Sequence, residues 1–327
     1  MFRVDDGPGI GAGHLMRCLA LAEAIVQEGG EVWLVTARES VFHERWRTLN
    51  AHVVLGIQQA GSEEDLAFTT NVCTRVGADW VIVDGYRFVC AWLDEMGSRA
   101  KTLWVDDLGL YDPAVALVLN HNPGADQRFA ARYKRCRQSL LGLEWFLLRR
   151  EFWRQESIIN RNGILICLGG EDTDDRVSQI VQAIASVPKK LTVDVVGSVS
   201  TSRLKSLADI TKNSESHFKL HEGPIQLAPL MSRARVMICG GGVTALEALS
   251  MGLRIVILVL ADNQAEGAIV LARMSQVRVV EAVDDWANKV VCAALQLSTD
   301  AERTQERHSL FLDGLGARRV LEQMRCL

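Results

Sequence analysis

Residues 163–170 read GILICLGG, an apolar run that ends in two glycines. Apolar side chains at both odd and even positions are typical of a strand buried on both faces, as in a parallel sheet covered by helices. Glycines after such a strand favour a tight turn into a helix. The stretch therefore predicts the first β–α unit of a sheet that starts halfway along a chain of 327 residues.

Outward from this stretch, short apolar runs recur in two series. The first series occupies residues 31–35, 52–56, 80–84, 102–106 and 116–120. The second series continues from residues 163–170 through 191–197, 234–242, 254–260 and 277–282. Amphipathic segments with the period of a helix separate the runs. We therefore expect an α/β protein with two Rossmann-like, doubly wound parallel-sheet domains that face one cleft.

A charged segment without a strand pattern, residues 142–163, lies between the two series. A chain of this length has room for two domains of about 150 residues each. We expect an amino-terminal domain over residues 1–148 and a carboxyl-terminal domain over residues 149–327.

The composition narrows the class of protein. Apolar residues make up 48% of the chain and charged residues 23%, as in an ordinary globular protein. The net charge of -4 gives no electrostatic reason to expect nucleic acid or anionic lipid as a partner. The cysteines are spread singly, without the CxxC pairs of a zinc site. The longest uncharged apolar run, residues 255–261, is far shorter than the roughly 20 residues that span a bilayer. We expect a cytoplasmic protein without a charged leader, a membrane partner or a metal.

Two glycine clusters follow strands of the second series. The clusters are LGG at 168–170 and CGGG at 239–242, and each precedes a helical pattern. A helix N-terminus offers free backbone N–H groups to an anion, and glycine lets the backbone approach a phosphate closely. Tight turns alone also explain an isolated cluster. Two clusters in one half of the chain favour phosphate binding.

The helix after the second cluster contains Thr244 and Glu247 in the sequence VTALEALSMG. Their spacing is that of a capping box, which needs no ligand. A carboxylate near a glycine turn is also the group with which nucleotide-binding folds hold both ribose hydroxyls. The spacing leaves both interpretations open.

His14 stands at the end of GIGAGH, directly before an amphipathic helical pattern. The third glycine of a dinucleotide motif is missing, since residue 16 is methionine, so no nicotinamide or flavin cofactor is expected. His14 could simply begin the helix. Histidine side chains titrate near neutral pH, so His14 could also take a proton from water at a strand end that faces a cleft.

Further polar residues end three strands of the first series and one of the second. They are Asp84 and Tyr86 around Gly85, Asp106 and Asp107, Asn120 to Asn122, and Asp262 to Gln264. Strand ends of a parallel sheet point to one edge, where ligands bind. Turn formation explains the first three groups equally well, and an N-cap explains the last.

In chain order, several segments together resemble the PseG family, the UDP-2,4-diacetamido-2,4,6-trideoxy-β-L-altropyranose hydrolases of pseudaminic acid synthesis. These segments are GIGAGHLMRCLALA, VDGYRF, VDDLG, LNHN, LLRREF, LGGED and GGVTALEALSMG followed by LADNQ. The similarity covers roughly residues 3–275, and the pattern Gly-x-Gly-His-x-x-Arg-Cys-Leu is its most specific part. The resemblance implies the GT-B fold of glycosyltransferases such as MurG.

The resemblance also implies a reaction: metal-independent attack of water on the anomeric carbon of a UDP-sugar, with inversion and without a cofactor. His14 matches the catalytic histidine, and Tyr86 matches a tyrosine of the sugar pocket. Gly13 and Arg17 are the other implied substrate-binding residues of the amino-terminal domain. The implied substrate contacts of the carboxyl-terminal domain are Gly169, Gly170, Gly241 and Gly242 at the diphosphate, Glu247 at the ribose, and Asn263 and Gln264 at the sugar. Val243 and Thr244 are further implied substrate-binding residues. A glycosyltransferase and a non-catalytic nucleotide-sugar binding subunit are the alternatives.

Overall fold

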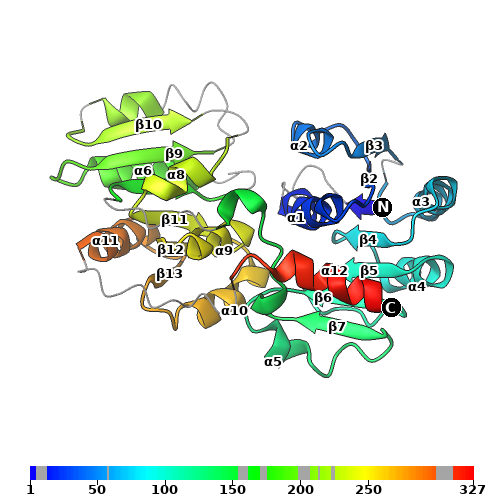
Figure 1. The fold of residues 1–327 in the computed structure, drawn as a ribbon. Coiled ribbons are helices and arrows are strands. Elements are labelled where there is room, and N and C mark those ends of the chain that lie inside the picture. The colour runs from blue at the N-terminus through cyan, green and yellow to red at the C-terminus, as the bar shows by residue number, and fades with distance from the viewer. Residues whose placement is uncertain are drawn as a thin grey trace. The chain divides into compact units, whose positions relative to one another are not determined.

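The structure is a computed structural model. It describes residues 1–4, 13–56, 59–153, 161–169, 175–197, 207–212, 214–221, 225–299 and 312–327, without the side chain of Asn263. The chain divides into two compact units, one formed by Met1–Arg150 with Leu310–Leu327 and the other by Glu151–Ser309. Each unit contains one parallel sheet (Figure 1).

The sheet of the first unit has seven parallel strands in the order β3-β2-β1-β4-β5-β6-β7. The strands are β1 (Phe2–Val4), β2 (Trp33–Thr36), β3 (His52–Leu55), β4 (Val81–Asp84), β5 (Thr102–Val105), β6 (Leu117–Asn120) and β7 (Gln138–Leu141). The strand order reverses between β1 and β4. Ligands of doubly wound sheets bind at such a switch point.

Both faces of this sheet are buried, as the apolar runs predict. Leu103 and Val105 of β5 pack into one apolar cluster, together with α1 (Gly13–Gln27), whereas Trp104 packs into a second cluster with α4 (Cys90–Arg99). Successive side chains of a strand point to opposite faces, so a strand covered on both sides is apolar at every position. Further described helices of this unit are α2 (His43–Arg47), α3 (Glu63–Val76), α5 (Ala125–Phe129), the 3₁₀ turn η1 (Leu143–Trp145) and α12 (Gly316–Cys326). The 3₁₀ turn η2 (Arg150–Phe152) includes the point in the chain where the second unit begins.

The second unit repeats the plan with six parallel strands in the order β10-β9-β8-β11-β12-β13. The strands are β8 (Ile164–Cys167), β9 (Thr192–Val196), β10 (His217–His221), β11 (Val236–Gly240), β12 (Arg254–Val259) and β13 (Val277–Glu281). Its helices include α6 (Arg176–Ala185), α8 (Ala228–Arg233), α9 (Val243–Ser250), α10 (Asp262–Leu271) and α11 (Trp286–Thr299). The switch point lies between β8 and β11. The prediction of two doubly wound parallel sheets is confirmed.

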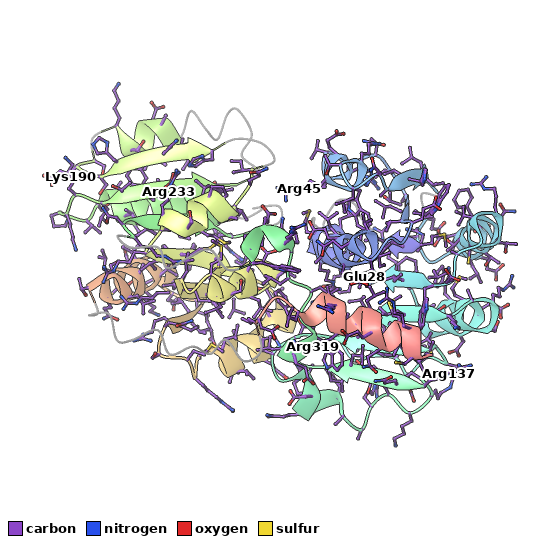
Figure 2. The ribbon with its side chains drawn as sticks, viewed as in Figure 1. Glu28, Arg45, Arg137, Lys190, Arg233 and Arg319 are labelled. Atoms are coloured by element: carbon purple, nitrogen blue, oxygen red, sulfur yellow. The ribbon has the colours of Figure 1, made fainter. Side chains whose placement is uncertain are left out.

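The carboxyl-terminal helix α12 differs from the expected division of the chain. The sequence predicts a second domain that contains all residues after 148, but α12 packs on α1 and η1 of the first unit. Its buried residues recur at helical spacing and join the same apolar cluster as α1: Ala317, Val320, Leu321 and Met324. Arg325 of α12 also pairs with Glu28 after α1 at 3.3 Å, and Figure 2 labels Glu28 beside this helix.

Within the described part of the chain, no helix combines the length and apolar character needed to cross a bilayer.

Candidate active site

His14 and Asp84 form a buried pair at the switch point of the first sheet. His14 is the second residue of α1, Asp84 is the last residue of β4, and the two side chains are 6% and 0% exposed. His14 Nδ1 lies 2.6 Å from Asp84 Oδ1. Because the carboxylate can only accept, Nδ1 is the donor of this bond, and in the neutral ring Nε2 carries the lone pair. The pair therefore holds the tautomer in which Nε2 can take a proton.

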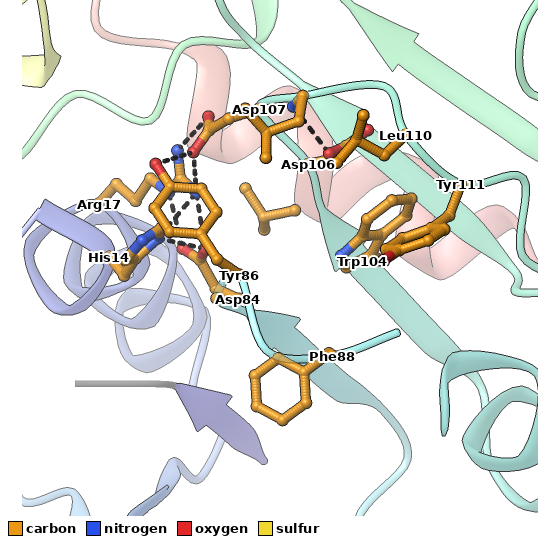
Figure 3. A pocket seen from close by; sticks show the side chains of 13 residues that line it. His14, Arg17, Asp84, Tyr86, Phe88, Trp104, Asp106, Asp107, Leu110 and Tyr111 are labelled. Atoms are coloured by element: carbon orange, nitrogen blue, oxygen red, sulfur yellow. Dashed lines mark hydrogen bonds and ion pairs between the residues drawn. The ribbon is translucent and has the colours of Figure 1, made fainter. Parts of the chain in front are cut away.

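Arg17 lies one helical turn after His14, so both side chains project from the same face of α1. Its guanidinium spans two carboxylates, with Nε 2.6 Å from Asp84 Oδ2 and Nη1 2.6 Å from Asp107 Oδ1 (Figure 3). Arg17 Nη2 also lies 3.0 Å from His14 Nδ1. Both nitrogens are donors that share the acceptor Asp84 Oδ1, so this close approach is not itself a hydrogen bond.

The charges of this group are fixed by their neighbours. Burial opposes ionisation of Asp84, but the adjacent Arg17 and His14 outweigh it and hold the pKa of Asp84 far below its usual value. Burial likewise opposes ionisation of Asp107, and Arg17 lowers the pKa of Asp107 to about 2. Burial also disfavours the charge on Arg17, but the two carboxylates raise the pKa of Arg17 well above its usual value. Asp84, Asp107 and Arg17 are therefore all charged at neutral pH.

Tyr86 connects His14 to Asp107. Its ring meets the His14 ring edge to face, with centroids 4.7 Å apart, and its hydroxyl donates to Asp107 Oδ2 at 3.3 Å. Asn122, after β6, donates to Asp107 Oδ1 at 2.9 Å. Cys18 donates its thiol to Asp84 Oδ2 at 3.3 Å. Residues from four neighbouring segments of the first unit thus converge on one hydrogen-bonded group.

Beside this group is a small pocket of about 40 Å³. This volume holds roughly two or three water molecules. His14, Arg17 and the acidic residues line one side, and the rest of the wall includes Phe88, Trp104, Leu110 and Tyr111 (Figure 3). A polar group that can accept a proton therefore faces a largely aromatic wall.

The loop after β5 is braced by Asp106, which holds Asp107 in place. The Asp106 carboxylate accepts the N–H groups of Leu108 and Gly109 at 2.9 and 2.8 Å and the hydroxyl of Tyr133 at 2.5 Å. Burial raises the pKa of Asp106. Gly109 has a φ of 64°, and a Cβ there would meet the Phe129 ring at 2.2 Å, so this turn needs glycine.

The glycine turns of the second unit lie side by side at its own switch point. Gly169 follows β8 and Gly241 follows β11, which is the neighbouring strand. A Cβ on Gly169 would lie 4.0 Å from Thr244 Oγ1, and one on Gly240 would lie 2.9 Å from the Leu168 carbonyl oxygen. Both turns therefore border the N-terminus of α9. Gly170 lies outside the described residues.

The start of α9 rules out the capping box. The N-cap of α9 is Gly242, without a side-chain hydrogen bond, so Val243 is the first helical residue and Thr244 lies inside the helix. The capping interpretation, in which Thr244 precedes the helix, is wrong. Glu247 is buried, at 1% exposure, within the second turn. The nucleotide contact of Glu247 stays a prediction.

Gln264 braces the second glycine turn. Its Oε1 accepts the N–H of Gly241 at 3.0 Å and the N–H of Leu260 at 3.3 Å, which ties the start of α10 to the end of β11. The expected N-cap at residues 262–264 is wrong, because Ala261 is the N-cap of α10. The side chain of Asn263 is not described.

The structure brings the predicted residues into two groups, one in each unit. His14, Arg17 and Tyr86 meet in the first unit, with exposed Gly13 beginning α1. The second group, in the second unit, consists of residues of the two glycine turns and of the start of α9: Gly169, Gly241, Gly242, Val243 and Thr244. Asp84, Asp107 and Asn122 were marked in the sequence only as strand-end residues, yet they hold the first group together.

Comparisons with known proteins find relatives by structure alone. No family model and no curated protein sequence matches the chain. MurG from Acinetobacter baumannii matches with a TM-score of 0.65 and 12% identity over 100% of this chain and 99% of that one. A UDP-GlcNAc 2-epimerase from Neisseria meningitidis, bound to UDP-GlcNAc, matches with a TM-score of 0.66 and 11% identity over 100% and 99%. A glycosyltransferase from Rickettsia africae matches with a TM-score of 0.64 and 12% identity over 99% and 97%.

At such identities the likeness concerns the fold. The matches span both sheets, so the chain has the GT-B fold, as the resemblance of its motifs implied.

Proposed function

We propose that the protein is a UDP-sugar hydrolase in which His14 activates the attacking water. The observation that carries the proposal is the buried bond of 2.6 Å between His14 Nδ1 and Asp84 Oδ1 at the switch point of the first sheet. A histidine held by a carboxylate in this tautomer is the arrangement of a general base. Solved structures with the same fold include one bound to UDP-GlcNAc, which supports a UDP-sugar as the small-molecule substrate.

The reaction follows from these groups. His14 Nε2 takes a proton from water while the water oxygen bonds to the anomeric carbon. The bond between this carbon and the diphosphate oxygen breaks, its electron pair leaves with UDP, and the configuration inverts. The imidazolium formed in this step is stabilised by the adjacent Asp84 carboxylate, which stays ionised.

The glycine turns of the second unit would hold the departing diphosphate. The backbone N–H groups at the start of α9 and the positive end of its helix dipole attract an anion, and glycines leave room for a phosphate to approach. In a site with little water, fixed dipoles of this kind stabilise developing negative charge strongly. They supply the stabilisation that a metal gives in other enzymes.

The pocket beside His14 supports water as the acceptor. Its volume of about 40 Å³ has room for water molecules next to the His14 side chain. The resemblance of the motifs supports 2,4-diacetamido-2,4,6-trideoxyhexose as the released sugar, in pseudaminic acid biosynthesis.

The test is a screen of UDP-sugars for release of UDP in the absence of any acceptor. Hydrolysis predicts stoichiometric UDP and free sugar, with the inverted anomer seen first by NMR. A glycosyltransferase, the class of enzyme to which several of the structural neighbours belong, would release UDP efficiently only when an acceptor is added. A 2-epimerase must break the bond between carbon 2 and hydrogen, so it would incorporate deuterium there in D₂O. A binding subunit would release none.

Glu247→Gln is expected to weaken binding of free UDP by about 1–3 kcal/mol, because charge-assisted hydrogen bonds to the ribose hydroxyls are lost. Titration calorimetry measures this affinity, and a melting curve of the same variant measures stability. Asp284→Asn removes an exposed carboxylate from the same unit and should leave UDP affinity unchanged. Unaltered UDP affinity in Glu247→Gln, together with a lower melting temperature, would assign Glu247 a structural role.

A further inference from the structure

The hydrogen-bonded group around His14 carries one more carboxylate than it has cations. The titratable residues that face it from the neighbouring described segments are Arg17 and Cys18 from α1, Asp84 and Tyr86 from β4 and its turn, Asp107 after β5, and His121 after β6. Arg17 is positive and both aspartates are negative. The formal charge of the group therefore depends on the remaining members.

These remaining members are neutral. Burial, followed by the nearby Asp84, raises the pKa of Cys18, and burial with Asp107 raises the pKa of Tyr86, so both keep their protons. Burial, followed by the charge of Arg17, lowers the pKa of His121 to about 3. His121 Nδ1 accepts the N–H of Leu147 at 3.3 Å, as a neutral ring can. The group thus has a formal charge of minus one while His14 is neutral, and zero once His14 is protonated.

Asp106 stands next to Asp107 in the chain but belongs to another set of contacts. Its carboxylate is bound by two backbone N–H groups and by the hydroxyl of Tyr133. It braces the loop and makes no hydrogen bond with the members of the group among those the structure gives.

We propose that Asp107 is a positioning residue that strengthens His14 as a base by supplying this second negative charge. Arg17 neutralises one carboxylate, and the proton that His14 takes from water neutralises the other. The proposal rests on the proposed hydrolase function, because it explains how His14, the base of that reaction, can take a proton from water. Asp107 acts through the group and not by contact with the reacting atoms.

The contacts of Asp107 suit this role. Arg17 binds it with two nitrogens, at 2.6 and 2.9 Å, and Asn122 and Tyr86 donate at 2.9 and 3.3 Å. Its side chain is only 10% exposed, so water screens its charge weakly. These donors hold the carboxylate in place. Asn122 and Tyr86 are neutral, so only Arg17 offsets the negative charge of Asp107, and Arg17 is shared with Asp84.

Asp107→Asn keeps the shape of the side chain and removes the charge. Protonation of His14 would then take the group from zero to plus one, so the imidazolium is less stable. We expect the acidic limb of the profile of kcat/KM against pH to move to lower pH by about one to two units. The plateau above the limb should fall about tenfold, since a weaker base removes the proton more slowly.

Two variants separate charge from structure. Tyr86→Phe removes a hydrogen bond to Asp107 without changing any charge, so its rate should fall while the acidic limb stays in place. Asp107→Glu keeps the charge at the cost of geometry and should also keep the limb. Where Asp107→Asn does not fold, Asp107→Ser, which adds no amide donor beside Arg17, removes the same charge.

NMR titration of the His14 ring gives a readout that needs no activity. The pH at which the imidazole is half protonated should be lower in Asp107→Asn than in the wild type, by the same one to two units. An unchanged midpoint and an unchanged acidic limb would overturn the role of Asp107. A wild type that releases no UDP from any UDP-sugar would instead overturn the proposed function, and the NMR titration would still decide the role of Asp107.

Discussion

His14→Asn is expected to bind UDP like the wild type and to release UDP from its UDP-sugar roughly 10²-fold to 10⁴-fold more slowly, the range for loss of a general base. The asparagine amide can still donate to Asp84, so the buried carboxylate keeps a partner in place of the 2.6 Å bond from the ring. What disappears is the lone pair of Nε2. Steady-state kinetics give the loss in kcat, and titration calorimetry with UDP gives the affinity.

His52→Asn is the matched control, because His52 is an exposed histidine of the same unit whose ring stacks on Trp33. Its kcat should equal that of the wild type. A His14→Asn enzyme with near wild-type turnover would mean that His14 only begins α1. Another group would then have to activate the water.

Arg17→Met is expected to lower the free energy of unfolding by about 3–5 kcal/mol, the typical cost of removing one partner from a buried ion pair. Arg17 and Asp84 have side chains that are 5% and 0% exposed, and Asp107 shares the same guanidinium. Without Arg17, two carboxylates remain in a region where water cannot solvate them. Unfolding in urea measures the loss.

The pH dependence of this loss has a definite sign. In the wild type, Arg17 holds the pKa of Asp84 and the pKa of Asp107 below their usual values. The ion pairs therefore stabilise the fold at pH values above the usual pKa of a carboxyl group. This stabilisation is lost as the pH falls through the lowered pKa values of the folded protein. In the variant the remaining donors, such as His14 and Asn122, oppose the effect of burial less strongly than Arg17 does, so ionised carboxylates destabilise the fold. The deficit should therefore be larger near pH 8 than near pH 5.

The exposed pair of Arg99 and Glu95 provides the control for Arg17→Met. Arg99→Met also removes an arginine from a helix of the first unit, but water solvates the remaining carboxylate. Surface pairs of this kind contribute at most about 1 kcal/mol. A loss in Arg17→Met no larger than in Arg99→Met would contradict the buried ion pairs.

The sequence predicts the fold well because its main signal is local. Leu103, Trp104 and Val105 of β5 are apolar in succession since both faces of the sheet are buried there, and this holds without knowledge of the neighbouring strands. The packing position of α12 cannot be predicted in this way, because it depends on contacts with distant parts of the chain. Its apolar face, which includes Val320 and Met324, is visible in the sequence, but nothing there says which sheet it covers.

The site could be predicted only in part, for a similar reason. His14 stands out through its glycine-rich motif, whereas Asp84 and Asp107 look like ordinary residues of strand-end turns. Their pairing with Arg17 depends on the adjacency of β1, β4 and β5, which the apolar runs do not reveal. The same holds for Gln264, whose bonds to the turn at Gly241 depend on the pairing of β11 with β12.

The central claim is that water activated by His14 attacks the anomeric carbon of a UDP-sugar. The most direct measurement is turnover in water enriched in ¹⁸O, without an acceptor, followed by mass spectrometry of the released UDP. Attack at carbon breaks the bond between carbon and oxygen, so the account predicts UDP that carries no ¹⁸O, at a rate that falls in His14→Asn. UDP labelled with ¹⁸O, which requires attack at phosphorus, or unlabelled UDP released equally fast by His14→Asn, would contradict it.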